Sequence, residues 1–522
     1  MYVIITLVLL SLATATIVGL RISRSSVSYS WLTATLGSLL AWVSILAWQI
    51  DLPRRFFPGQ WAPGSLFNAS PELWADSNAW LYALSLAALA AAVILTSPAR
   101  AGKVVNASGW AGTLALTALG LLAVLADNPL TLVLGWTAID VTEFFNTLRS
   151  SDSPSVSERT VVSFAFRAAG TGCALWAGVI GALNGRTFLF ENATPQTGIF
   201  LLLAVGLRLG VLPIHLTYQS EPPLRRGFGS VLRLMAAATS LILLARLPAS
   251  ALDARYAPYL LLFVSYAALY GGWKWLFASD ELNGRPYWII GMGALSLAAN
   301  LRGSSTGSAA WGAALVLFGG ISFLYSARNI WYTRVLAGLG ILLLALPFSL
   351  TGTGWTGAFP WPVLFWPAFI GAHFMLVAGY IRHLLHPGEI SFSELPTWAQ
   401  TAYPLGLGLL GLTALLTGVW GWPGARQLGI WPAAAVLIVI GAAAGFAIWR
   451  LKRFAPTELS FPSITQASRL ENLLSFMARI FWALYRLLGS VFGLAANLLE
   501  GDGGLLWTLL LLVLFITIFR SH

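Results

Sequence analysis

The sequence predicts an all-α polytopic membrane protein with about 14–16 transmembrane helices. Hydrophobic residues occupy 57% of its 522 positions and charged residues only 9%, whereas a soluble globular chain carries about a quarter charged residues. The apolar runs are continuous and about 18–22 residues long, without the period of two that marks a strand. In hydrocarbon only helices and closed barrels satisfy their own backbone hydrogen bonds, so these runs indicate helices.

The apolar runs place the spans along the whole chain. They lie near residues 2–21, 31–50, 79–97, 109–126, 129–148, 161–184, 198–216, 228–246, 257–277, 286–302, 307–325, 333–350, 362–381, 401–420, 430–449 and 503–519. The longest polar break near the N-terminus, 51–77, contains Pro53, Pro58 and Pro63, and we expect a loop at the membrane surface there.

Arginine and lysine indicate the orientation. They are more frequent in loops after odd-numbered helices, a group that includes Arg100, Arg226 and Arg285, than in loops after even-numbered ones. The positive-inside rule therefore predicts a multi-pass protein of the cell (inner) membrane with its N-terminus outside. We attribute the net charge of +11 to loop arginines that orient the chain in the membrane. We expect the chain to contact the lipid bilayer and to bind no nucleic acid.

The C-terminal segment has a different pattern. Between 468 and 500 apolar residues recur at helical spacing with polar residues on the other side, which predicts an amphipathic helix lying along the membrane or its neighbours. Gly501 to Gly504 end it before a terminal anchor helix at 503–519. The amphipathic helix either ties partner subunits together or is a surface helix without a partner.

Four predicted spans carry five charged residues that are candidates for a role at membrane depth. Asp140 and Glu143 lie in the fifth, Arg167 in the sixth, Arg208 in the seventh and Arg233 in the eighth. Each costs about 2.5–3.5 kcal/mol or more at the centre of a membrane, so each is a candidate functional residue. Pairing of opposite charges across the bundle is one interpretation. The alternative for Glu143 and Arg233 is that they lie near helix ends and reach the interface.

The seventh span contains helix-breaking residues beside its charge. Gly210 and Pro213 follow Arg208, and His215 comes next. Proline removes a backbone hydrogen bond, and broken spans persist where the freed groups line a polar cavity or are satisfied by protein. His215 has two open roles: it relays protons near neutral pH, or it hydrogen-bonds the broken helix.

Three stretches resemble the antiporter-like membrane subunits of respiratory complex I, Mrp-type cation/proton antiporters and membrane-bound hydrogenases. They are 125–136 with Asp127-Asn128-Pro129 and Trp136, 208–223 with Pro213-Ile214-His215, and 344–352 with Leu346-Pro347. The resemblance implies inverted five-helix repeats and a second helix break at Pro347, besides a lateral helix and a terminal anchor. We accordingly divide the chain into N-terminal helices (1–105), a first repeat (106–250), a second repeat (251–385), additional helices (386–455) and the lateral helix with its anchor (456–522).

The departures from that family concern its proton-handling residues. Thr137 stands where the family has a glutamate after tryptophan, and Arg208 stands where it has a lysine. A buried lysine can lose its proton, but a guanidinium stays charged. We expect Asp140, one turn after Thr137 and on the same helix face, to replace the missing carboxylate.

The sequence therefore predicts an antiporter-like subunit of a complex-I-like or Mrp-like assembly, with a degenerate proton path and a scaffolding or coupling role among other membrane subunits. One alternative is an active translocator of protons or monovalent cations that uses Asp140, Glu143, His215 and water. Another is an accessory subunit of an ion-driven uptake system.

No catalytic signature accompanies these features. The chain lacks a phosphate loop, a dinucleotide fingerprint, Cys/His metal spacing and a nucleophile motif. We expect no cofactor, no metal site and no catalytic site of its own, so any enzymatic role is that of a non-catalytic subunit of an NADH/quinone oxidoreductase-like or hydrogenase-like complex. His383 and His386 lie near Glu389 and Glu394, where a solvated loop is favoured over metal binding.

Overall fold

The computed structural model divides the chain into two compact units, Met1–Ala442 and Ala443–His522. The described residues all belong to the first unit and are 2–24, 26–57, 70–100, 107–149, 154–182, 188–215, 226–253, 255–355, 365–386, 389–421, 436, 438, 439 and 441. The predicted amphipathic helix at 468–500, the terminal anchor and most of the span at 430–449 lie outside the described residues.

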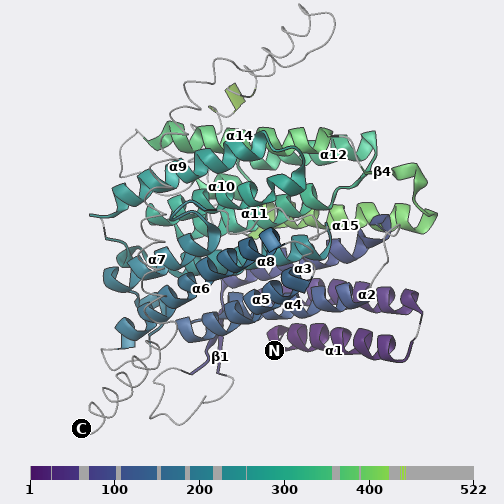
Figure 1. Cartoon of the computed structure of the whole chain (residues 1–522), viewed down its shortest axis with the longest axis horizontal. Coiled ribbons are helices and arrows are strands. Elements are labelled where there is room, and N and C mark those ends of the chain that lie inside the picture. Colours follow the sequence, from purple (N-terminus) through teal and green to yellow (C-terminus); the bar gives the residue numbers. More distant parts are fainter. Residues whose placement is uncertain are drawn as a thin grey trace, which may run out of the picture. The chain divides into compact units, whose positions relative to one another are not determined.

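Fifteen α-helices make up most of the described part (Figure 1). They are α1 (Tyr2–Ile22), α2 (Val27–Leu46), α3 (Ser77–Leu95), α4 (Ala107–Leu125), α5 (Pro129–Arg149), α6 (Pro154–Ala182), α7 (Pro195–Leu209), α8 (Phe228–Arg246), α9 (Ala257–Leu276), α10 (Glu281–Leu301), α11 (Ser305–Leu324), α12 (Ile330–Leu339), α13 (Leu350–Gly354), α14 (Trp366–Leu385) and α15 (Thr397–Leu416). Every span predicted between residues 2 and 420 coincides with a helix or with a broken helix.

The all-α membrane fold predicted from the sequence is confirmed. Within the described residues, nine helices are long and apolar enough to cross a membrane. The chain is therefore a multi-pass membrane protein. The predicted inverted repeats and the five-part division of the chain stay predictions.

Two small sheets interrupt the helices. Strand β1 (Arg54–Phe56) pairs antiparallel with β2 (Leu73–Ala75), with Arg55 opposite Trp74. Strand β3 (Ala327–Arg328) pairs parallel with β4 (Ile390–Ser391). The segment 51–77, which we expected to be a loop, thus contains a short hairpin. Its second strand leads to Asp76, whose side chain accepts a hydrogen bond from the Ala79 amide and caps α3.

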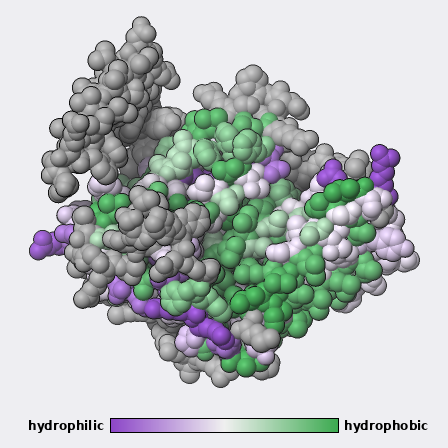
Figure 2. All heavy atoms as spheres, turned by 90° about the horizontal axis from the view of Figure 1, so that it is seen from below, coloured by the Kyte–Doolittle hydropathy of each residue, from purple (hydrophilic) through white to green (hydrophobic). Residues whose placement is uncertain are grey.

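Three helices form the centre of the packing. In the apolar 18-residue stretch of each helix, 94% of the residues are buried in α3, 94% in α8 and 100% in α11. In α1 the share is only 28%, and exposed apolar side chains such as Leu12 cover its outer side. Figure 2 shows the apolar surface on the face seen from below. Because lipid is as apolar as leucine, the central helices are held by close packing of small residues rather than by a hydrophobic driving force.

The seventh span ends early. Gly210 follows α7 with a φ of 73°, a left-handed conformation that glycine adopts without steric cost. The amides of Val211 and Leu212 donate to the carbonyl of Gly206, at 2.9 and 3.2 Å. Pro213 comes next and cannot continue the helix because it has no amide hydrogen. The freed backbone groups next to Arg208 are therefore partly satisfied within the break itself.

A second break separates α12 from α13. Ala345 and Phe348 have φ values of 56° and 64°, and Pro347 lies between them. The Thr351 hydroxyl donates to the carbonyl of Leu342 at 2.8 Å. The Ser349 side chain accepts from the Gly352 amide and caps α13. Side chains near the break thus replace hydrogen bonds that a continuous helix would form.

Helix α10 begins earlier than its predicted start at residue 286. The Asp280 side chain accepts hydrogen bonds from the amides of Leu282 and Asn283, so it caps the helix and Pro286 falls inside it. Proline near a helix start loses few hydrogen bonds. Arg285, which we counted as a loop residue, consequently lies within α10 and is only 4% exposed. Its charge is placed in the protein interior, so the expectation that it lies in a loop was wrong.

We predict that the close crossing of α9 and α10 depends on Gly271. A Cβ atom at this position would lie 2.5 Å from the Gly291 amide nitrogen and 2.9 Å from the Tyr287 carbonyl oxygen. Gly271→Ala should therefore lower the free energy of unfolding by about 1–3 kcal/mol, the usual cost of overpacking, and with it the melting temperature. Gly19→Ala in α1 is the matched control because nothing lies within 4 Å of the added carbon. Equal melting temperatures for the two variants in detergent would contradict this tight crossing.

Candidate functional site

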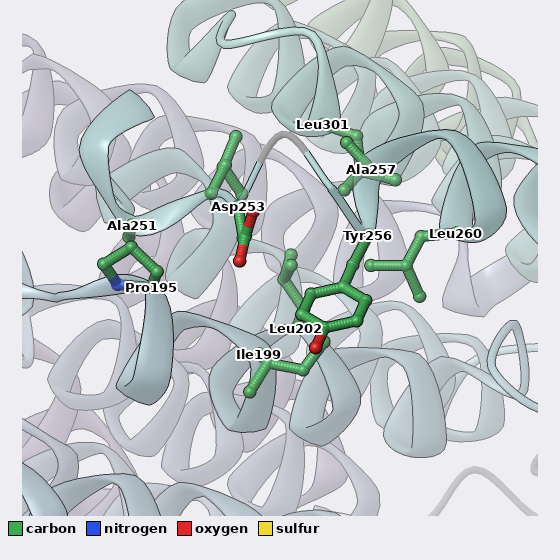
Figure 3. A pocket seen from close by; sticks show the side chains of 10 residues that line it. Pro195, Ile199, Leu202, Ala251, Asp253, Tyr256, Ala257, Leu260 and Leu301 are labelled. Atoms are coloured by element: carbon green, nitrogen blue, oxygen red, sulfur yellow. The ribbon is translucent and has the colours of Figure 1, made fainter.

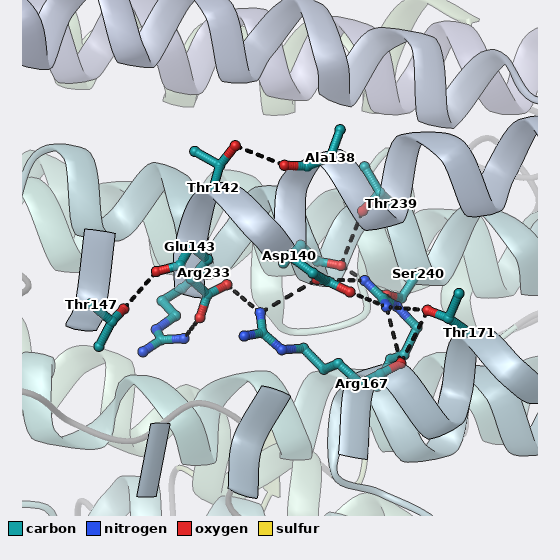
Figure 4. Close-up of polar contacts among 12 residues, drawn as sticks. Ala138, Asp140, Thr142, Glu143, Thr147, Arg167, Thr171, Arg233, Thr239 and Ser240 are labelled. Carbon is teal, nitrogen blue, oxygen red and sulfur yellow. Dashed lines mark hydrogen bonds and ion pairs between the residues drawn. The ribbon is translucent and has the colours of Figure 1, made fainter. Parts of the chain in front are cut away.

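A cluster of buried charges joins four consecutive helices. Asp140 and Glu143 come from α5, Arg167 from α6, Arg208 from α7 and Arg233 from α8, and each residue is at most 3% exposed. Figure 4 shows the two carboxylates on one side of α5, facing the guanidinium groups. The structure therefore brings together five of the six candidate charged or titratable residues.

Arg208 binds Asp140 through two hydrogen bonds. Its Nη1 donates to Oδ2 at 2.6 Å and its Nη2 to Oδ1 at 3.0 Å, the two-pronged geometry in which guanidinium and carboxylate match best. The Nε donates to the Ser240 hydroxyl at 3.1 Å, and Nη1 also reaches the Thr171 hydroxyl at 3.1 Å. Arg208 is thus fixed from α5, α6 and α8 at once.

Two residues make room for this guanidinium. Trp136 lies under it, with the Arg208 Cζ 4.2 Å from the ring centroid, and the Trp136 Nε1 donates to the Thr239 carbonyl at 2.9 Å. On α6, a Cβ at Gly170 would lie 2.7 Å from the Arg208 Cγ and 2.8 Å from the Ala204 carbonyl oxygen. Glycine at 170 therefore lets the arginine side chain pass between α6 and α7.

Glu143 lies between two arginines. One carboxylate oxygen accepts from Arg167 and the other from Arg233. The Arg167 Nη1 also lies 3.5 Å from the Asp140 Oδ1, which links the two halves of the cluster. The side chains of Glu143 and Arg233 are 2% and 3% exposed. They pair inside the bundle, so the geometry disfavours the alternative in which they reach the membrane surface.

The helix face of α5 differs from the expected one. Thr137 is exposed, whereas Asp140 is buried in the cluster. Residues three apart on a helix are rotated by about 60° relative to each other, and here that rotation separates the outer surface from the interior. Our expectation that both positions share a face was wrong, and only position 140 meets Arg208.

His215 lies beyond the break after α7. Its Nδ1 is 2.8 Å from the Pro213 carbonyl oxygen, and its ring stacks on Phe166 with the centroids 4.0 Å apart. Its amide donates to the carbonyl of Gly210 at 3.1 Å. These contacts favour the second of the two roles considered for His215, hydrogen bonding to the broken helix, and its role stays a prediction.

A second charged group lies where α8 and α10 begin, and sequence reasoning missed it. The Arg226 Nη2 is 2.6 Å from the Glu281 Oε1, and its Nε donates to the Glu389 Oε1 at 2.8 Å. Glu281 is 2% exposed, and Arg285 follows it one turn later on α10. No local pattern points to Glu281, because its burial depends on the helix start set by Asp280.

His373 of α14 was also missed. Its Nδ1 accepts a hydrogen bond from the Trp355 Nε1 at 3.2 Å, and its Nε2 lies 2.6 Å from the Leu343 carbonyl oxygen at the second break. Because Nδ1 accepts, Nε2 carries the proton and donates to that carbonyl. A single histidine on an apolar helix gives no sequence signal, so only the packing of α14 against the break reveals this contact.

The described part has pockets away from the buried charge cluster. The pocket in Figure 3 is lined by apolar residues with Asp253 and Tyr256, and its cavity volume of about 10 Å³ suits no more than one water. In the described residues no group of three or more His, Cys, Asp or Glu side chains is placed to hold a metal ion. His383 lies with its Nε2 2.9 Å from the Trp275 carbonyl oxygen.

Comparison with known proteins gives structural matches alone. No protein-family model matches the sequence, and no curated protein matches it. The membrane-bound sulfane sulfur reductase, an archaeal respiratory membrane complex, contains a chain with a TM-score of 0.66 and 14% identity, covering 98% of this chain and 99% of that one. A chain of the Mrp complex from Dietzia sp. DQ12-45-1b has a TM-score of 0.65 and 15% identity, covering 100% and 63%.

A chain of respiratory complex I from Thermus thermophilus has a TM-score of 0.61 and 19% identity, covering 84% of this chain and 99% of that one. At these identities the likeness is one of fold. The resemblance to antiporter-like membrane subunits that the motifs indicated is thus confirmed at the level of the fold.

We predict that Arg208 and Asp140 stabilise the bundle only as a pair. Arg208→Met removes the guanidinium group that pairs with the buried Asp140 carboxylate. It should lower the free energy of unfolding by about 3–5 kcal/mol. Arg208→Lys keeps the charge and should be milder, although it loses the two-pronged geometry. The double variant Arg208→Met/Asp140→Leu should be more stable than Arg208→Met alone, because no charge is stranded. Thermal unfolding of the unmodified protein, the single variants Arg208→Met and Asp140→Leu and the double variant measures this coupling, and strictly additive effects would argue against the pair.

Proposed function

We propose that this chain, which has the fold of the antiporter-like membrane subunits, is a scaffolding and coupling subunit of an ion-translocating membrane assembly, and that its own proton path is degenerate. The observation that carries the proposal is chemical: among the described residues, the cations of the buried cluster are the arginines Arg167, Arg208 and Arg233. Scaffolding here means that the cluster fixes α5 to α8 as one unit against which partner subunits pack.

Arginine suits a fixed charge and not a proton carrier. The guanidinium group keeps its proton at any pH a protein meets, whereas a buried lysine can release it. A relay needs a group whose two protonation states are both accessible. Arg208 is in addition bound by Asp140, Ser240 and Thr171, so a change of its position would break several hydrogen bonds at once.

The carboxylates of the cluster are equally constrained. Asp140 lies within hydrogen-bonding distance of Arg208 and 3.5 Å from Arg167, and Glu143 lies between Arg167 and Arg233. Adjacent cations favour the ionised carboxylate. Protonating either acid would leave buried guanidinium groups with less compensation, which is costly away from water. The whole cluster therefore supports a static role.

The partners we infer are other membrane subunits. The matched chains come from structures named as a respiratory membrane complex, an Mrp complex and respiratory complex I. The amphipathic segment predicted at 468–500, with a terminal anchor after it, suits attachment to such partners. We also infer a location in the cell (inner) membrane with the N-terminus outside, from the distribution of loop arginines.

A second candidate function is active translocation of protons or monovalent cations. The observation that favours it is the depth of Asp140, the twelfth of the 21 residues of α5, which would place a carboxylate near the middle of a membrane. Intramembrane acids often mark ion pathways. In this case Asp140 or Glu143 would take up and release a proton through water.

We predict that Asp140→Asn leaves proton flux per assembled complex unchanged in proteoliposomes, because Asp140 holds a fixed ion pair and carries no proton. The complex that copurifies with a tagged chain is reconstituted, and flux is normalised to the amount of intact complex. His215→Ala should likewise be without effect on flux. Thr142→Ala on the same helix is a matched control, because its hydroxyl bonds only to the Ala138 carbonyl.

Two outcomes separate the candidates. A clear loss of flux in well-assembled Asp140→Asn, with normal flux in Thr142→Ala, would establish translocation and remove the scaffold proposal. Flux that stays at the level of the unmodified complex in both variants supports the fixed cluster.

We predict further that the chain purifies with other membrane subunits and that deleting residues 465–522 releases at least one of them. Native mass spectrometry of the detergent-solubilised material measures the composition before and after deletion. A chain that is monomeric in both states would contradict the scaffolding role.

A further inference from the structure

Asp127 lies at the junction between two membrane helices, apart from the buried cluster. It follows the last residue of α4, Leu125, and precedes the first residue of α5, Pro129. Its amide donates to the carbonyl of Glu72 at 3.0 Å, and its carbonyl accepts from the Phe190 amide at 3.2 Å. The backbone of Asp127 thus ties the junction to the hairpin β1–β2 and to the short 3-10 helix η3 (Phe190–Asn192).

The side chain of Asp127 is buried, and among the described residues it has no hydrogen-bond donor. The residue is 0% exposed, and neither carboxylate oxygen accepts a hydrogen bond from another described residue. Its contact with Arg55 is an ion pair in which Nε lies 3.2 Å from Oδ2. A buried ionised carboxylate is normally stabilised by several donors, so the ionised form of Asp127 is poorly supported here.

Acids outnumber cations around this side chain. In the described residues that surround Asp127, four carboxylates face two guanidinium groups. They are Glu72 and Asp76 at the two ends of β2, Glu191 of η3 and Asp127 itself, with Arg55 of β1 and Arg246 of α8 as the cations.

Both arginines are already engaged with other acids. Arg55 Nη2 lies 2.8 Å from the Glu191 Oε2. Arg246 Nη2 lies 3.4 Å from the Asp76 Oδ1 and donates to the Trp74 carbonyl at 2.7 Å. The positive charge of these arginines therefore only partly neutralises Asp127 and Glu72. Two neighbouring carboxylates of like charge disfavour each other's ionised form.

We propose that Asp127 is a proton-binding site at the junction of α4 and α5, with Glu72 as the neighbouring acid that strengthens proton uptake. It is distinct from the buried ion pairs because Asp140 lies eleven residues into α5, about 17 Å further along the helix axis. The inference goes beyond the proposed function and does not depend on it.

The electrostatics of the junction, outside the spanning segments, agree with this geometry. Burial raises the pKa of Asp127 above its ordinary value, and the charges of Arg246 and Arg55 only partly offset that rise. Burial, followed by the charge of Asp127, raises the pKa of Glu72.

Water reaches the rim of the site. The side chains of Arg55 and Glu191 are 36% and 42% exposed, whereas that of Asp127 is 1% exposed. Arg55 also lies over Trp74, 4.9 Å from its ring centroid, so the hairpin covers the acid without sealing its rim. The buried carboxylate of Asp127 is therefore adjacent to a solvent-exposed ion pair.

The test is infrared difference spectroscopy of the full chain, purified with its partners and titrated with acid. We predict a protonated carboxylic acid signal that disappears in Asp127→Asn. Glu191→Gln is the matched control, since it removes an exposed acid of the same cluster. It should keep that signal, with a lower pKa, because the charge of Glu191 no longer raises the pKa of Asp127 and Arg55 is freed from its pair with Glu191. The measurement requires no transport, so its result is independent of the flux test.

Two further variants keep Asp127 and test the proposal even if Asp127→Asn does not fold. Arg55→Gln removes the adjacent cation and should raise the pKa of the signal, whereas Glu72→Gln removes the adjacent acid and should lower it. The Glu72 carbonyl that binds the Asp127 amide is retained. The proposal is overturned if the signal survives Asp127→Asn, if it titrates no higher than an ordinary aspartate, or if neither flanking variant shifts it.

Discussion

A guanidinium buried among membrane helices has to be paired, and the pair of Arg208 with Asp140 meets this requirement at the centre of the bundle. Several local features follow from it. Gly170 lets the side chain pass between α6 and α7, Trp136 lies under the guanidinium, and Ser240 and Thr171 take its other hydrogens. The pair therefore fixes the relative rotation of α5, α6, α7 and α8, because each helix must present one polar or small residue to the same point.

The broken helices obey a related constraint on the backbone. Carbonyls and amides freed inside a membrane protein must find partners within the protein. At the first break the amides of Val211 and Leu212 share the Gly206 carbonyl. At the second, Thr351 and His373 satisfy the carbonyls of Leu342 and Leu343. Breaks of this kind are usually associated with ion pathways; here the residue beside the first one is an arginine engaged on all sides.

The chemical character of the cluster thus depends on residue type more than on fold. A fold that matches chains of respiratory and Mrp complexes can hold either exchangeable or permanent charges at its centre. Guanidinium groups make them permanent. The acids with the least support from neighbouring donors lie elsewhere, at the edge where Asp127 meets the hairpin. We thus assign proton binding to the junction before α5 and mechanical rigidity to the middle of α5, around Asp140.

The sequence by itself determined the membrane fold, the positions of the spans and the break after Arg208, because bilayer thickness sets the length of an apolar run and glycine and proline act locally. It also identified the five buried charges, since a charge inside a span is rare. Only the tertiary structure decided which arginine meets which acid, that Thr137 faces outward while Asp140 faces inward, that Arg285 lies inside α10, and that His373 reaches the second break. These outcomes depend on helix rotation and on contacts between residues far apart in the chain, which no local pattern encodes.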